Sequence, residues 1–348
     1  MEKKDRKNII GNIIKWIIIL VVLVLVYFWK QEEIHDAINE MKHHPFWVSL
    51  LCLAATLLHF VVEGRIIHDM TMYEKRQMTW FEAFKCGLYC AFYKLISLGS
   101  LSGIAEVYYI ARHDIEPGRS SGITLVQYAY QKLGITILGI LSFIYLYSAG
   151  VPTVIKYAKF GVLGSFISFT IVALLLTLSA STRFAGLLIK IVRFFEKRLL
   201  AKYKEKLEEL IEQITTFNEA GLYFWRHKTL CLRVTLLKML KMSLWYSIAA
   251  IVVCATNDAS PLTCIALMAT VNMIGTVMAA PAGAGTLEFV IALIFTPLFG
   301  NTSAAVAILY RFYTMVVPFL LGSIVFATTG KMKNTSKTNE GIAQETNG

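Results

Sequence analysis

Two glutamates that each follow a run of small residues are the strongest candidates for chemistry in this sequence. Glu288 and Glu106 each close a Gly-x-x-Glu motif. The next predicted span carries a single cation in each case, Arg311 after Glu288 and Lys132 after Glu106. An ionisable side chain within an apolar stretch is costly and usually functional, so we interpret both acid–cation sets as candidate binding groups.

The small residues before Glu288 predict a break in a helix. Pro281 has no backbone N–H, and Gly283 and Gly285 weaken a regular helix, so backbone amides and carbonyls lose their partners there. A half-helix that starts near Gly285 would direct its positive N-terminal end toward an anion such as a phosphate. A plainer interpretation stays open, in which Glu288 is an acid in the first turn of that helix and is satisfied locally.

The composition places these residues in a membrane. Hydrophobic residues make up 56% of the 348 residues and charged residues 16%, against about 25% charge in a typical soluble domain. The apolar residues gather in runs close to the roughly 20 residues that a spanning helix needs. We therefore predict an all-α polytopic membrane protein with about six spanning helices. Their apolar cores lie near residues 13–29, 46–62, 123–148, 159–181, 236–256 and 303–328.

Lysine and arginine predict the orientation of these spans. Cations precede the first run, follow the second and the last, and fill the segment 183–228, whereas the other loops hold few. Basic loops stay cytoplasmic, so we expect a multi-pass protein of the cytoplasmic membrane with both termini inside. The apolar segments 79–112 and 261–300 must then each enter and leave on one side, the first from the cytoplasm and the second from outside. Each is a re-entrant hairpin or two full spans, which gives about 8–10 spans if the hairpins cross fully.

The two broken segments share one order of elements. Each holds a small-residue stretch, a Gly-x-x-Glu motif and an apolar half-helix, and a span with one cation follows. The same order in opposite orientation is typical of an inverted-topology repeat, with broken helices that meet near the midplane. We expect residues 1–330 to form one transmembrane domain built on this repeat, and residues 331–348 to be a disordered cytoplasmic tail.

The segment 183–228 predicts a basic amphipathic helix at its start. Apolar residues recur there at helical spacing, with Arg183, Lys190, Arg193 and Lys197 between them. Such a helix suits the surface of an anionic leaflet. A plain helical linker packed on the bundle is the alternative.

Other ligands are not indicated. The net charge of +11 does not predict a nucleic-acid partner, because the cations flank apolar runs. The six cysteines form no Cys-x-x-Cys pair and the seven histidines show no metal-binding spacing, so we expect no metal and no other cofactor. The sequence leaves the oligomeric state open, a homo-oligomer included.

The second broken segment and the span behind it resemble a known family. Residues 280–288 read Ala-Pro-Ala-Gly-Ala-Gly-Thr-Leu-Glu, and the next span carries Arg311, Pro318 and Gly322. This order resembles the flippase-like transmembrane region of lysylphosphatidylglycerol synthases. There a proline, small residues and Gly-x-x-Glu precede a helix with one arginine, a proline and a glycine. The first half departs from the family, since Lys132 follows a glutamine where Glu-Arg is usual.

The resemblance implies a module that translocates a lipid headgroup across the cytoplasmic membrane, with an anionic or aminoacylated phospholipid or a glycolipid as substrate. Full-length family members carry a separate C-terminal domain that makes lysylphosphatidylglycerol from lysyl-tRNA. We expect that domain to be absent, so the chain is expected not to be an enzyme, and a phosphatidylglycerol lysyltransferase label would rest on homology alone. On this interpretation the substrate-binding residues are Pro281, Gly283, Gly285, Glu288, Arg311, Glu106 and Lys132.

Two functions of other classes stay open. The chain is alternatively a non-transporting membrane partner that anchors a separate lipid- or envelope-modifying enzyme through its basic segment. It is alternatively a secondary transporter for a small soluble anion, since a broken helix end also suits such a ligand.

The predicted orientation can be tested by labelling. In a variant without the six native cysteines, Glu205→Cys should react with a membrane-impermeant thiol reagent only after the cells are opened, because the segment 183–228 is expected inside. Strong labelling of Glu205→Cys in intact cells would overturn the orientation.

Overall fold

The computed structural model describes residues 31–72, 78–97, 99–196, 204–275 and 285–329. Within these ranges the chain is helical and has no strand. Five helices in the described part are long and apolar enough to cross a membrane, which confirms the all-α polytopic class. The predicted span over 13–29 and the predicted tail over 331–348 lie outside the described residues. The five are α3 (Phe46–Thr71), α6 (Pro117–Ser148), α8 (Ala158–Ala180), α11 (Lys228–Cys254) and the composite rod Thr302–Thr328.

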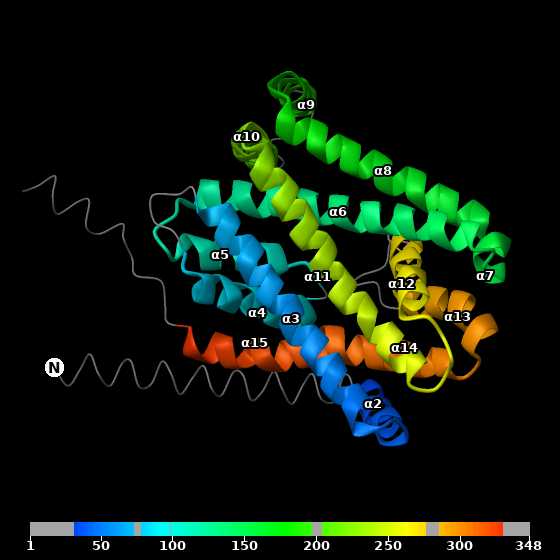
Figure 1. Ribbon diagram of the computed structural model, residues 1–348. Helices are drawn as coiled ribbons and strands as arrows, with labels where there is room; N and C mark the ends of the chain where they lie inside the picture. The colour runs from blue at the N-terminus through cyan, green and yellow to red at the C-terminus, as the bar shows by residue number, and fades with distance from the viewer. Residues whose placement is uncertain (1–30, 73–77, 98, 197–203, 276–284, 330–348) are drawn as a thin grey trace, which may run out of the picture.

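The two segments predicted to be broken each form a pair of shorter helices. The first pair is α4 (Trp80–Ile96) and α5 (Ser102–Ala111), and the second is α12 (Pro261–Gly275) and α13 (Thr286–Phe299). Helices α5, α12 and α13 have 10, 15 and 14 residues, short of the roughly 20 needed for a full crossing. Figure 1 shows the pairs at opposite ends of the molecule, α4 and α5 at the left and α12 and α13 at the right.

A glycine in a left-handed conformation precedes the second helix of each pair. Gly99 has φ +92° in the turn before α5, and Gly285 has φ +78° at the N-terminus of α13. Residues with a Cβ rarely adopt this region, so glycine permits both turns. The predicted helix start near Gly285 is confirmed, whereas Pro281 and Gly283 lie outside the described residues.

Each pair of shorter helices packs against a span of the other half of the chain. Helix α4 packs against α15 (Val317–Thr328), the last helix of the second half, and α12 packs against α6, the last span of the first half. Helices α3 and α11, the spans that come before the two pairs of shorter helices, pack against each other and cross obliquely over the other spans (Figure 1). This reciprocal packing agrees with the predicted repeat and brings residues of both halves to the centre.

The last span changes its winding between α14 (Thr302–Arg311) and α15. Residues Phe312–Val316 form a π-helical turn, η3, in which the Val317 N–H donates to the Phe312 carbonyl. The Tyr313 carbonyl instead accepts a hydrogen bond from the Thr56 hydroxyl of α3 at 3.0 Å. Pro318 follows directly and has no N–H to donate, which favours a departure from α-helical bonding here.

The basic segment forms two helices, α9 (Thr182–Glu196) and α10 (Lys204–Arg226). Leu187 and Ile191 of α9 are exposed beside Arg183, Lys190 and Arg193, so this helix is amphipathic as predicted. Helix α10 packs on α6 and α8, as the linker alternative expects. Lys197 lies outside the described residues, and the interaction with a leaflet stays a prediction. Two short helices, α2 (Gln31–His43) and α7 (Pro152–Lys156), complete the described fold.

The close contact of α4 and α15 gives a stability prediction. A Cβ at Gly322 would lie 2.3 Å from the Leu88 carbonyl oxygen, so Gly322→Ala should force the helices apart and cost about 1–3 kcal/mol of unfolding free energy. Thermal unfolding of purified protein, followed by circular dichroism, measures this loss.

The control is Gly186→Ala in α9, where an added Cβ meets nothing within 4 Å and alanine favours the helix. Equal thermal stability of the two variants would contradict the tight packing of α4 on α15.

Candidate functional site

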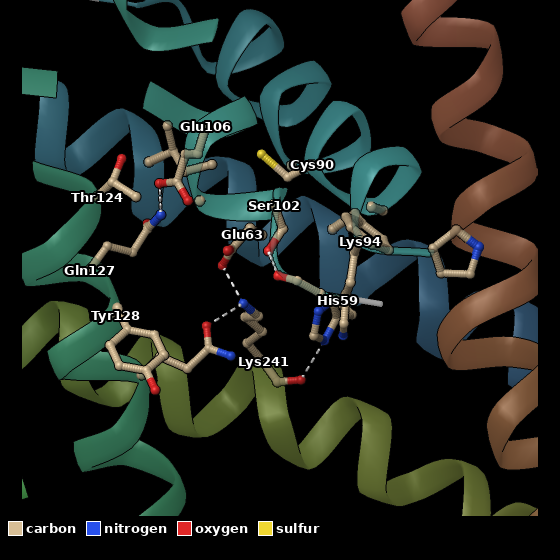
Figure 2. A pocket seen from close by; sticks show the side chains of 18 of the residues that line it. His59, Glu63, Cys90, Lys94, Ser102, Glu106, Thr124, Gln127, Tyr128 and Lys241 are labelled. Atoms are coloured by element: carbon tan, nitrogen blue, oxygen red, sulfur yellow. Dashed lines mark hydrogen bonds and ion pairs between the residues drawn. The ribbon is translucent and has the colours of Figure 1, made fainter. Parts of the chain in front are cut away.

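A cavity of about 570 Å³ with charged side chains in its walls lies between the two halves of the bundle. Its volume falls in the range of roughly 300–1,000 Å³ typical of small-molecule sites. Helices α3, α4, α5, α6 and α11 supply its walls, with η3 and the start of α15 at one side. Figure 2 shows charged side chains from several helices directed into one space. The acidic, basic, histidine and amide side chains among the lining residues are His59, Glu63, Lys94, Glu106, Gln127, Gln131 and Lys241.

Glu63 of α3 is held between two lysines of α11. Its Oε2 atom lies 2.7 Å from Lys241 Nζ and 3.3 Å from Lys238 Nζ. The Lys238 side chain is 0% exposed, and apolar surroundings strengthen the attraction while making an unpaired charge expensive. One carboxylate balances only one of two ammonium groups, so the ionised cluster carries a net positive charge. Lys241 also donates to Gln131 Oε1 at 3.1 Å.

An aromatic stack lies beside this cluster. The His59 and Trp245 rings are parallel, with centroids 3.7 Å apart and planes at 4°. His59 Nδ1 donates to the Lys241 carbonyl at 2.9 Å, which leaves Nε2 as the acceptor nitrogen of the neutral ring. Lys94 Nζ of α4 lies 5.0 Å from the Trp245 ring centroid, within reach of a cation–π interaction. Among the described residues Lys94 makes no ion pair, so its charge is available to a ligand.

Glu106 of α5 faces the same cavity without a cation. The Gln127 side-chain amide of α6 donates to its carboxylate through Nε2, and no described lysine or arginine lies within ion-pair distance. Figure 2 shows this pair on the opposite side of the Glu63 carboxylate from Lys94. The cavity therefore offers a ligand one carboxyl group, of Glu106, and one ammonium group, of Lys94, that no oppositely charged described residue pairs with.

The structure brings together the other predicted acid and cation. Arg311 of α14 donates to both Glu288 oxygens, through Nε to Oε1 and through Nη2 to Oε2 at 3.0 Å. This is the bidentate geometry that favours arginine. Neither side chain is among the residues that line the described cavity, although Arg311 Nη1 contacts the sulfur of Met315, which does line it. Their role in substrate binding stays a prediction.

Lys132 is placed differently from Glu106. Its Nζ lies 5.4 Å from the centroid of the Tyr128 ring, and it is not among the residues that line the cavity. In the half of the chain that contains Glu106 and Lys132, the lysine that faces the cavity is therefore Lys94. The predicted role of Lys132 stays untested.

Sequence reasoning missed Glu63, Lys94, Gln127 and Lys241 as cavity residues. One signal was available, because Lys238 and Lys241 stand within a predicted span, where charge usually marks a polar path. Glu63 directly follows the predicted apolar core 46–62, so the sequence alone places it at the end of a span.

A family model for the transmembrane region of lysylphosphatidylglycerol synthase matches residues 12–322. The chain belongs to this family. The match includes every residue that lines the cavity, and it links this multi-pass membrane protein to lipid metabolism or transport. A comparison with curated proteins found no match.

The cluster of Glu63, Lys238 and Lys241 gives a stability prediction for this member of the family. Glu63→Gln leaves Lys238 and Lys241 buried without their acid, and it should lower the unfolding free energy by roughly 3–5 kcal/mol. Replacing all three residues by methionine should recover much of that loss, because no buried charge then remains. Glu209→Gln on α10 is the control, since Glu209 is exposed and accepts only a 3.4 Å bond from Gln213. Glu63→Gln protein as stable as this control would refute the role of the cluster.

Proposed function

We propose that this protein translocates the polar headgroup of a membrane lipid across the bilayer while the acyl chains stay in the surrounding lipid. The observation that carries the proposal is the cavity in which Lys94 and Glu106 lack described charge partners. Moving an ion into hydrocarbon costs many kcal/mol, so a protein lowers this barrier by offering a polar path. The family's link to lipid metabolism or transport supports the same conclusion.

The two charges suggest how a headgroup would be held. Lys94 would pair with a lipid phosphate, and the net positive charge of the Glu63–Lys238–Lys241 cluster would favour the same group. Glu106 would accept a cationic group, such as an aminoacyl amine. An anionic or aminoacylated phospholipid, or another charged lipid, fits this arrangement.

The second half would supply a second binding position. Glu288 and Arg311 hold each other, so a headgroup would have to exchange with one member of the pair. The backbone next to Gly285, with the N-terminus of α13, suits a phosphate, and we extend this role to Pro281 and Gly283. Rocking of one half against the other would move access between the leaflets. No catalytic step is part of this proposal.

The membrane placement that we propose is the cytoplasmic membrane with both termini inside. In that orientation Arg183, Lys190 and Arg193 of α9 would face the inner leaflet, with Leu187 and Ile191 inserted between headgroups. This exposed amphipathic face also favours a second candidate function, a membrane anchor for a separate lipid-modifying enzyme.

The transport function can be tested in liposomes. Purified protein should accelerate the exchange of fluorescent phospholipids between leaflets, and Lys94→Met should slow it roughly tenfold or more, because a charged hydrogen-bond partner of the phosphate is lost. The matched control is Lys85→Met on the same helix, since Lys85 is paired with Glu82 at 2.9 Å and does not line the cavity.

Comparison of headgroups at equal acyl chains completes the test. If every lipid exchanges at the protein-free rate, the transport function is wrong and the anchoring candidate gains support. If Lys85→Met slows exchange as much as Lys94→Met does, the cavity is not the path.

A further inference from the structure

The contact between Glu106 and Gln127 leaves one hydrogen-bonding group unused. Gln127 lies on α6 with 3% of its surface exposed. Its Nε2 donates to Glu106 Oε1, while its Oε1 is buried and accepts no hydrogen bond. Buried polar atoms are nearly always hydrogen-bonded, so this acceptor calls for a donor that the described residues do not provide.

The protonation state of Glu106 decides whether that donor exists. An ionised carboxylate has only acceptors, so it satisfies the amide N–H and leaves the amide oxygen alone. A protonated carboxyl has one O–H donor and one carbonyl acceptor. Such a carboxyl facing a primary amide can form two antiparallel hydrogen bonds, here one from its O–H to Gln127 Oε1 and one from Gln127 Nε2 to its carbonyl. The Gln127 side chain is therefore complementary to the protonated acid.

The charged groups around Glu106 do not hold its carboxyl in the ionised state. Glu63 faces the same cavity, and its charge is already opposed by Lys238 and Lys241. No described cation pairs with Glu106 to hold it ionised, and Lys94 lies against Trp245. The titratable groups that face Glu106 from the elements around it are His59 and Glu63 on α3, Cys86, Cys90 and Lys94 on α4, Tyr128 on α6, and Lys238 and Lys241 on α11.

We propose that Glu106 and Gln127 form a proton-binding site within the cavity, and that a proton and the ammonium group of a lipid headgroup occupy this carboxyl in turn. A proton from cavity water binds a Glu106 oxygen when the headgroup leaves, and it returns to water when the next ammonium group arrives. One cationic headgroup would then move against one proton. The exchange with a headgroup rests on the proposed function, whereas the proton site stands without it.

Infrared difference spectroscopy of the full chain in phosphatidylglycerol–phosphatidylcholine vesicles tests the site directly. On raising the pH, the C=O stretching band of a protonated carboxyl should disappear, and Glu106→Gln should remove that band from the difference spectrum. Gln127→Met should move the band to the position of a carboxyl with fewer hydrogen bonds. The control Glu82→Gln should keep it unchanged, because Glu82 binds Lys85, Tyr109 and His113 outside the cavity lining.

A transport measurement on the same vesicles tests the exchange. A pH gradient should change the rate of leaflet exchange of a fluorescent phosphatidylethanolamine, which carries an amine. It should not change that of a fluorescent phosphatidylglycerol, which carries none. In Glu106→Gln the response to the gradient should be lost.

The outcomes separate the two ideas. Absence of a band that depends on Glu106 would overturn the proton site, whatever the transport result. A band that depends on Glu106, in protein that moves no lipid, would support the proton site and refute the proposed function. Lipid exchange that ignores the gradient for both probes would refute the coupling of proton and headgroup.

Discussion

Glu63 of α3 lies between two lysine ammonium groups of α11 where these two helices cross, and the arrangement of the other charged groups in the interior depends on this contact. Two polar contacts join helices α3 and α11 and set their relative rotation. Lys238 and Lys241 meet Glu63, and nearer the helix ends Arg233 Nε lies 3.0 Å from the buried Asp69 carboxylate. The same rotation places His59 against Trp245 and the Lys241 carbonyl. Charged walls then keep the space between the helices polar, because apolar side chains cannot fill it without burying unpaired charge.

The two halves use their acids differently. Glu288 binds Arg311 through two parallel hydrogen bonds, whereas Glu106 accepts from the Gln127 amide of the neighbouring helix and pairs with no described lysine or arginine. The motifs around the two acids are alike in sequence. What distinguishes them is the residue that the next span presents: an arginine faces the acid in one half, and Gln127 faces it in the other. Two similar motifs thus give one glutamate that is paired with an arginine, Glu288, and one that is not paired with a described cation, Glu106.

Sequence reasoning recovered the elements that depend on strong local signals. Long apolar runs located the described spans, Gly285 located the start of α13, and the isolated charges Glu288 and Arg311 proved to be partners. It did not recover the cavity. On a helix that is apolar nearly all round, such as α3, periodicity gives no rotation, so the direction in which Glu63 points depends on packing with α11. For the same reason the sequence does not show that Lys94 of α4 faces the cavity and Lys132 of α6 does not, since each is a lysine within an apolar stretch.

The π-helical turn η3 has a consequence for the angular positions of residues along the last span. Each residue of an α-helix advances the direction of its side chain by about 100°, and a π-turn advances it by less because more residues share each turn. The directions of all side chains after η3 are therefore shifted relative to those before it. Arg311, before the turn, reaches Glu288 on α13, while Gly322, after it, meets the Leu88 backbone of α4. Because of the five π-helical residues, the side of the span that meets α13 and the side that meets α4 differ in direction by an angle that a uniform α-helix would not give.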